Sequence, residues 1–101
     1  MTRLLDFVMN DGSRHFASLP ATASWESVRD HATALAGATI TGFLCDGVTE
    51  AWIDFTYKGE AFTINDQFGE YWFFSTNPRC PESMLAEVAT HWESLLGRVN
   101  A

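Results

Sequence analysis

The chain has 101 residues, a formal net charge of −7, and 47% hydrophobic residues, which is enough apolar material for a single domain over 1–101. The excess of 13 acidic over 6 basic residues repels phosphate groups, so we expect neither nucleic acid nor anionic membrane as a partner. No run approaches the roughly 20 apolar residues of a membrane span, and no apolar leader follows Met1, so we expect a cytoplasmic protein.

The first elements in the chain are a predicted β-hairpin and a helix. Residues 3–9 read as a strand with Leu5, Phe7 and Met9 on one side and Leu4, Asp6 and Val8 on the other. The turn-forming run Asn10-Asp11-Gly12-Ser13 follows, and 14–19 form the return strand, which predicts a hairpin over 3–19. Pro20 cannot continue the ladder. An apolar stripe with helical spacing then predicts a helix over about 24–36, and Gly37 suits its end.

The pattern changes to period two from 39 to 75, with glycine-containing turn signals at 45–48, 57–60 and 66–69. This predicts a four-stranded meander. Pro78 and Pro81 then end the sheet, and a continuous apolar stripe predicts a second amphipathic helix over about 81–97. The order ββαββββα predicts an α+β fold, in which a twisted, largely antiparallel sheet carries both helices on one face. The hairpin could join either edge of the meander.

Alternation along the meander assigns its side chains to two faces. The face expected beneath the helices holds Ile40, Leu44, Ala51, Ile53, Phe55, Tyr57, Phe62, Ile64, Tyr71 and Phe73. The opposite face is expected to hold Phe43, Cys45, Trp52, Asp54, Thr56, Thr63, Asn65, Trp72 and Phe74. A solvated sheet face is normally polar, so the large aromatic residues on this second face are unusual.

This second face is the main candidate for a binding site, formed by Phe43, Trp52, Asp54, Asn65, Trp72 and Phe74. Exposed apolar patches usually mark interaction sites. The face could form a homodimer interface, contact another protein, or hold a small apolar or planar ligand that Asp54 and Asn65 orient by hydrogen bonds. Alternatively, the hairpin or the sheet's curvature covers these rings as a second small core.

Cys80 is a second, weaker candidate. It precedes the predicted second helix and follows Arg79, and both a helix N-terminus and a neighbouring cation can lower the pKa of a thiol. However, a nucleophile needs a positioned base, and no base is evident in the sequence. A structural cysteine is therefore the simpler interpretation, with a small thiol-dependent enzyme as the alternative function.

Neither a metal nor a cofactor is expected. His15, His31 and His91 share no short spacing with one another or with a cysteine, as metal ligands usually do. The seven glycines are scattered singly, so there is no phosphate-binding loop. The sequence thus favours a non-enzymatic binding or interaction domain that contacts itself or another protein through the aromatic sheet face. A small-molecule-binding domain that uses the same face is an alternative, and the sequence names no ligand or partner.

Overall fold

The structure, a computed structural model, describes residues 4–45, 51–67 and 69–97. It has a six-stranded antiparallel sheet with the strand order β1-β2-β6-β5-β4-β3, together with two α-helices. The predicted α+β class is therefore confirmed. The elements in chain order are β1 (Phe7–Val8), β2 (Arg14–Pro20), α1 (Trp25–His31), the 3₁₀ turn η1 (Ala32–Ala34), β3 (Ala38–Cys45), β4 (Ala51–Tyr57), β5 (Glu60–Gln67), β6 (Glu70–Ser75) and α2 (Glu82–Leu96).

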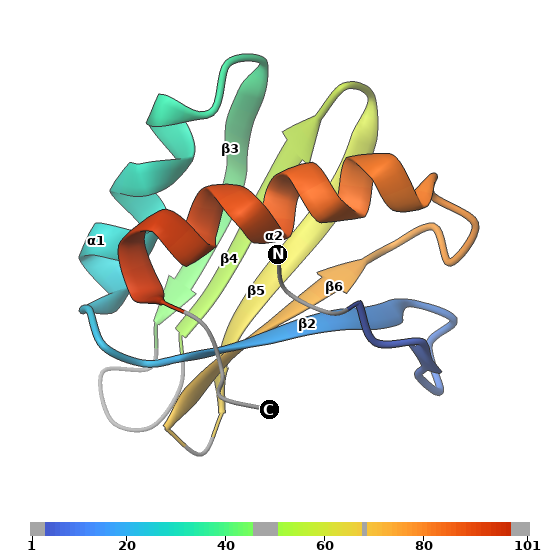
Figure 1. Cartoon of the computed structure of the whole chain (residues 1–101), viewed down its shortest axis with the longest axis horizontal. Helices are drawn as coiled ribbons and strands as arrows, with labels where there is room; N and C mark the ends of the chain where they lie inside the picture. The colour runs from blue at the N-terminus through green and yellow to red at the C-terminus, as the bar shows by residue number, and fades with distance from the viewer. Residues whose placement is uncertain (1–3, 46–50, 68, 98–101) are drawn as a thin grey trace.

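The N-terminal hairpin joins the sheet beside the last strand of the meander. β2 pairs antiparallel with β6, and the short β1 pairs with β2 at the edge. In the connecting turn, Asp11 Oδ1 accepts hydrogen bonds from the backbone N–H and the hydroxyl of Ser13, and Gly12 has a φ of 89°. A positive φ favours glycine there. The strands fan out from β3 to β2, so that β2 crosses the direction of β4 (Figure 1).

The four-stranded meander lies where the sequence predicted it. The turn between β4 and β5 is formed by Lys58 and Gly59, both at positive φ, in the predicted range 57–60. The predicted turns at 45–48 and 66–69 contain residues 46–48 and 68, which lie outside the described residues. The side chains of Leu44 and Cys45 also lie outside the described part of the structure. The faces predicted for these two side chains therefore stay predictions.

β-Bulges change which residues share a face in β2 and β3. In β2, the register shifts between His15 and Ala17, so Phe16 and Leu19 are both fully buried although strict alternation would separate them. In β3, the register shifts between Ile40 and Gly42. An extra residue in one strand turns the side chains beyond it to the other face.

The bulge in β3 makes the predicted position of Phe43 wrong. Phe43 pairs with the buried Ile53 rather than with an outward-facing residue of β4. Its ring stacks on Trp25 of α1 with the centroids 4.7 Å apart. Phe43 therefore lies on the α1 side of the sheet and does not belong to the opposite face.

The first helical segment is shorter than predicted. α1 begins after Ser24, whose hydroxyl accepts from the N–H of Ser27, and the chain passes through η1 to an extended Leu35. The expected helix over 24–36 is thus divided into a seven-residue α-helix and a 3₁₀ turn. Gly37 follows with a φ of 90° and leads the chain into β3.

Trp92 of α2 lies at the centre of the hydrophobic core. It is fully buried, and its ring contacts Phe55 of β4 and Phe73 of β6 with centroid distances of 5.0 and 5.6 Å. Its indole N–H donates to the carbonyl oxygen of Val28 in α1. One side chain thus joins both helices and the sheet, and α2 crosses in front of the central strands (Figure 1).

Within the described part of the chain, none of the helices has the length and apolar character needed to span a membrane.

Candidate functional site

Cross-strand pairing brings the remaining predicted site residues onto one face of the sheet. Side chains of directly paired antiparallel residues lie on the same face. Trp52 of β4 pairs with Asn65 of β5, which pairs with Trp72 of β6. In the adjacent row, Asp54 pairs with Thr63, which pairs with Phe74. We call these six residues the aromatic face.

The aromatic face is hollowed into a concavity of about 530 Å³. This volume is typical of small-molecule sites. All six residues of the aromatic face line it, and the N-terminal hairpin supplies Met9, Asp11 and Ser13. Thr76, just after β6, completes the lining.

The aromatic side chains of the concavity are partly open to solvent. Trp52 is 37% exposed and Met9 is 38% exposed, while Trp72 and Phe74 are half-buried. The alternative that the sequence left open, a second core closed over these rings, is therefore formed only in part. A ring system of this kind offers an apolar surface that a bound molecule can cover.

Two carboxylates are held in place on the lining. Asp54 is exposed, and its Oδ1 accepts a hydrogen bond of 2.7 Å from the hydroxyl of Thr63. Asp11 is held by Ser13, whose hydroxyl and backbone hydrogen bonds lower the pKa of Asp11 below its usual value. Asp11 is therefore ionised at neutral pH.

Asn65 differs from the other polar residues of the lining because it is fully buried. Its Nδ2 donates to the carbonyl oxygen of Ala51 at 3.2 Å. In the register it lies between Trp52 and Trp72. Since a buried amide must keep its hydrogen bonds, Asn65 supports the strands beneath the two indoles rather than offering a free amide to a ligand.

His15 supports the aromatic face from β2. It is buried, its ring stacks on Trp72 at 4.7 Å, and it lies 5.1 Å from the ring of Phe74. Its Nε2 lies 3.1 Å from the carbonyl oxygen of Ala17 and 2.9 Å from the hydroxyl oxygen of Ser18. Burial is the main cause that lowers the pKa of His15, so the ring is neutral at neutral pH.

Sequence reasoning missed His15 and the residues of the hairpin. It identified Trp52, Asp54, Asn65, Trp72 and Phe74, which the structure brings together, but it included Phe43, which the structure does not. The strand-like pattern of 3–9 predicted a strand and left open the edge of the sheet that it would join. Only the pairing of β2 with β6 brings Met9, Asp11 and Ser13 to the concavity.

Cys80 lies in a separate region near the start of α2. It is buried, its Sγ lies 3.6 Å from the Sδ of Met84, and burial raises the pKa of the thiol above its usual value. Both properties oppose an activated thiolate. The hydroxyl of the nearby Ser75 donates to the carbonyl oxygen of Asn77.

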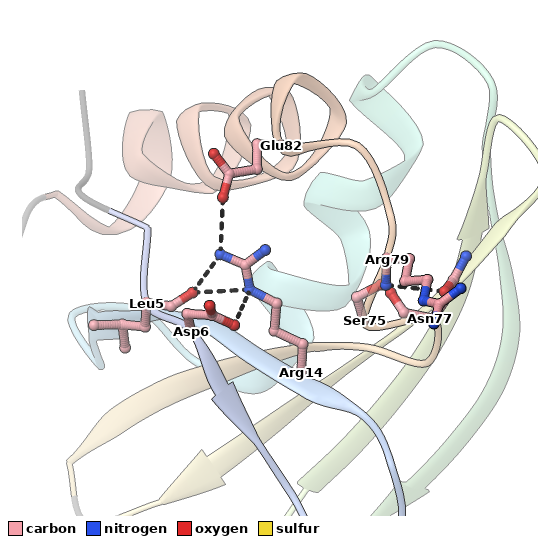
Figure 2. Close-up of polar contacts among 7 residues, drawn as sticks. All are labelled: Leu5, Asp6, Arg14, Ser75, Asn77, Arg79 and Glu82. Carbon is pink, nitrogen blue, oxygen red and sulfur yellow. Dashed lines mark hydrogen bonds and ion pairs between the residues drawn. The ribbon is translucent and has the colours of Figure 1, made fainter.

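Arg14, whose charge acts on Cys80, is buried and contacts Leu5, Asp6 and Glu82 (Figure 2). Its Nε and one terminal nitrogen donate to the carbonyl oxygen of Leu5 at 3.0 and 2.8 Å. The guanidinium also lies 3.4 Å from carboxylate oxygens of Asp6 and Glu82. Arg14 therefore joins the N-terminal segment to β2 and α2, a structural role that the sequence did not reveal.

His31 of α1 and His91 of α2 meet between the two helices. Their rings stack with the centroids 4.0 Å apart. No group of three or more His, Cys, Asp or Glu side chains that could hold a metal ion occurs within 4–45, 51–67 and 69–97. These two histidines therefore connect the two helices.

The chain matches no protein-family model, and no curated protein or solved structure is significantly similar to it. The functional argument therefore depends on the geometry of the aromatic face.

Proposed function

We propose that this protein is a non-enzymatic binding domain that takes a small ligand into the concavity of its aromatic face. In this proposal both helices pack on one face of the sheet and leave the other face for the ligand. The observation that carries it is the concavity itself, with a volume of about 530 Å³ and a lining of two indoles, Phe74 and fixed polar groups. Sites for small molecules are concave and largely apolar, with a few polar groups that orient the ligand.

Tryptophan fluorescence tests this proposal. The protein is titrated with a library of metabolites, and ligands that quench its emission are tested again with Trp52→Phe and Trp72→Phe. We expect each substitution to reduce the quenching, because both indoles line the concavity. Trp25→Phe is the matched control, since Trp25 stacks on Phe43 beside α1. Equal quenching in all three variants, or no quenching by any compound, contradicts the proposal.

Self-association is a second candidate function, and the exposed apolar side chains of the edge strand β1 favour it. Phe7 and Val8 of the edge strand β1 are 59% and 64% exposed, and Met9 of the concavity follows them. Exposed apolar edge strands tend to pair with other chains. Light scattering over a range of concentrations tests this candidate. We expect a dimer that Val8→Lys dissociates, and a monomer at every concentration would contradict it.

The thiol enzyme at Cys80 is the least supported alternative. The thiol is buried, its pKa is raised by burial, and the nearby guanidinium of Arg14 is shared among Leu5, Asp6 and Glu82. The concavity, by contrast, is open and holds several oriented groups. The binding function is therefore the one that the geometry favours.

A further inference from the structure

The lining of the concavity combines aromatic rings with negative charge. Trp52, Trp72 and Phe74 supply the rings, and Asp11 and Asp54 supply the carboxylates. No lysine or arginine is among the lining residues in the described part of the chain. An apolar ligand would need only the rings, so the two carboxylates call for a separate explanation.

We propose that the concavity binds an organic cation, namely a small molecule that carries an ammonium or quaternary ammonium group. This inference rests on the proposed function and specifies the class of its ligand. A cation is attracted to the face of an aromatic ring, most strongly to tryptophan, and the attraction increases where water is excluded. Carboxylates beside the rings add direct charge attraction.

The spacing of the two tryptophans suits a small group between them. Trp52 and Trp72 occupy β4 and β6 and are separated in the register by Asn65 of β5. Adjacent strands lie about 4.8 Å apart, so the backbones of the two tryptophans are about 10 Å apart. A methylated ammonium group, a few ångströms across, is small enough for a space of this width.

The position of Asp54 is fixed at the edge of this space. Oδ1 is held by the hydroxyl of Thr63. On the neighbouring strand, a Cβ atom at Gly42 would lie 3.1 Å from Oδ2, so the absence of a side chain at Gly42 leaves room for this oxygen. Thr63 of β5 thus holds one oxygen, and Gly42 of β3 makes space for the other.

Three basic side chains in the described part of the chain are paired with carboxylates elsewhere. Arg14 pairs with Glu82, Arg29 pairs with Asp30, and Lys58 pairs with Glu87. None of these basic residues lines the concavity. The net charge of −7 further attracts cations and repels anions. The electrostatic environment therefore favours a cationic ligand over an anionic one.

A matched pair of probes tests the charge requirement. Choline and its uncharged isostere 3,3-dimethyl-1-butanol have nearly the same shape, so calorimetric or fluorescence titration of both isolates the effect of charge. We expect choline to bind roughly tenfold more tightly than the isostere. Equal affinities would overturn the inference about charge while leaving the proposed ligand-binding function intact. If neither these probes nor any library compound bound, both proposals would fail.

Two isosteric substitutions test the location. Asp54→Asn is expected to weaken choline binding by roughly fivefold to tenfold and to leave the affinity for the isostere unchanged. Glu26→Gln is the control, because it removes the same charge from an exposed residue of α1. Equal losses of choline affinity in the two variants would show that only the net charge of the protein matters, and would overturn the location proposed for the site.

Replacing an aromatic residue provides an independent readout. Trp52→Leu retains an apolar side chain but removes the ring, and Trp52 is exposed enough that folding should be preserved. We expect a several-fold loss of choline affinity with a smaller change for the isostere, and circular dichroism checks the fold. Trp52→Phe should give an intermediate loss. An unchanged preference for choline in both variants would contradict the aromatic contribution.

Discussion

His31 of α1 and His91 of α2 form a reciprocal pair. Each Nε2 hydrogen-bonds to the other residue's backbone carbonyl oxygen, at 2.8 Å for His31 and 2.7 Å for His91. Carbonyl oxygens only accept, so each Nε2 carries a proton. An imidazole ring that carries a proton on Nε2 and none on Nδ1 is neutral. The two rings are stacked with their centroids 4.0 Å apart, so a second proton on each ring would bring two positive charges together.

This pair predicts a loss of stability in acid. Burial is the main cause that lowers the pKa of His91 below its usual value of 6.5; the hydrogen bond to the backbone of His31 partly opposes this shift, and charge repulsion from the His31 ring adds to it. The unfolded chain therefore binds more protons, so this contribution to stability is complete above pH 6.5 and is lost as the pH falls through the folded pKa. We expect His91→Gln, which keeps a donor but does not titrate, to flatten the pH dependence of the unfolding free energy.

Denaturant titrations at several pH values between about 7 and 5 measure this slope. His15 retains part of the pH dependence in the variant, because burial lowers its pKa as well. A slope identical to that of the wild type would contradict the prediction for His91.

Replacing Arg14 is expected to lower the stability of the fold. Arg14→Lys cannot reproduce the two hydrogen bonds that Nε and the terminal nitrogen donate to Leu5. We expect a loss of about 1–2 kcal/mol, measured by urea unfolding. Arg79→Lys is the control, because Arg79 is exposed, and it should change stability by less than about 0.5 kcal/mol. Equal effects would mean that the contacts with Leu5 contribute little.

Replacing Trp92 in the core is expected to lower the stability more than replacing Arg14. Trp92→Phe removes the hydrogen bond to Val28 and leaves space among Phe55 and Phe73. We expect destabilisation of about 2–4 kcal/mol by thermal or denaturant unfolding. Trp25→Phe, in which a half-buried ring is replaced, should cost clearly less. Comparable losses would contradict the central position of Trp92.

The burial of Cys80 predicts a slow reaction with thiol reagents. In a Cys45→Ser background, so that Cys80 is the single cysteine, we expect modification at neutral pH to be at least about tenfold slower than that of a free thiol. Denaturant should abolish the difference. Burial raises the pKa of this thiol, so the rate should continue to rise above the usual titration range of cysteine. Rapid modification of the native protein would instead support the thiol-enzyme alternative.

The sequence by itself determined the class of the fold and the membership of most of the aromatic face. From β4 to β6 the pairing has no register shift, so the period of two is unbroken. Trp52, Asp54 and Asn65 could be assigned to their face by counting, and so could Trp72 and Phe74. Local alternation is sufficient wherever the ladder is regular.

Only the tertiary structure decided the rest of the site. The bulge in β3 moves Phe43 to the side of α1, and the pairing of β2 with β6 brings Asp11 and Ser13 to the concavity. A bulge depends on the partner strand, and the choice of an edge depends on residues 50 to 61 positions away in the chain. Neither is encoded in local periodicity, because both result from the packing of the whole sheet.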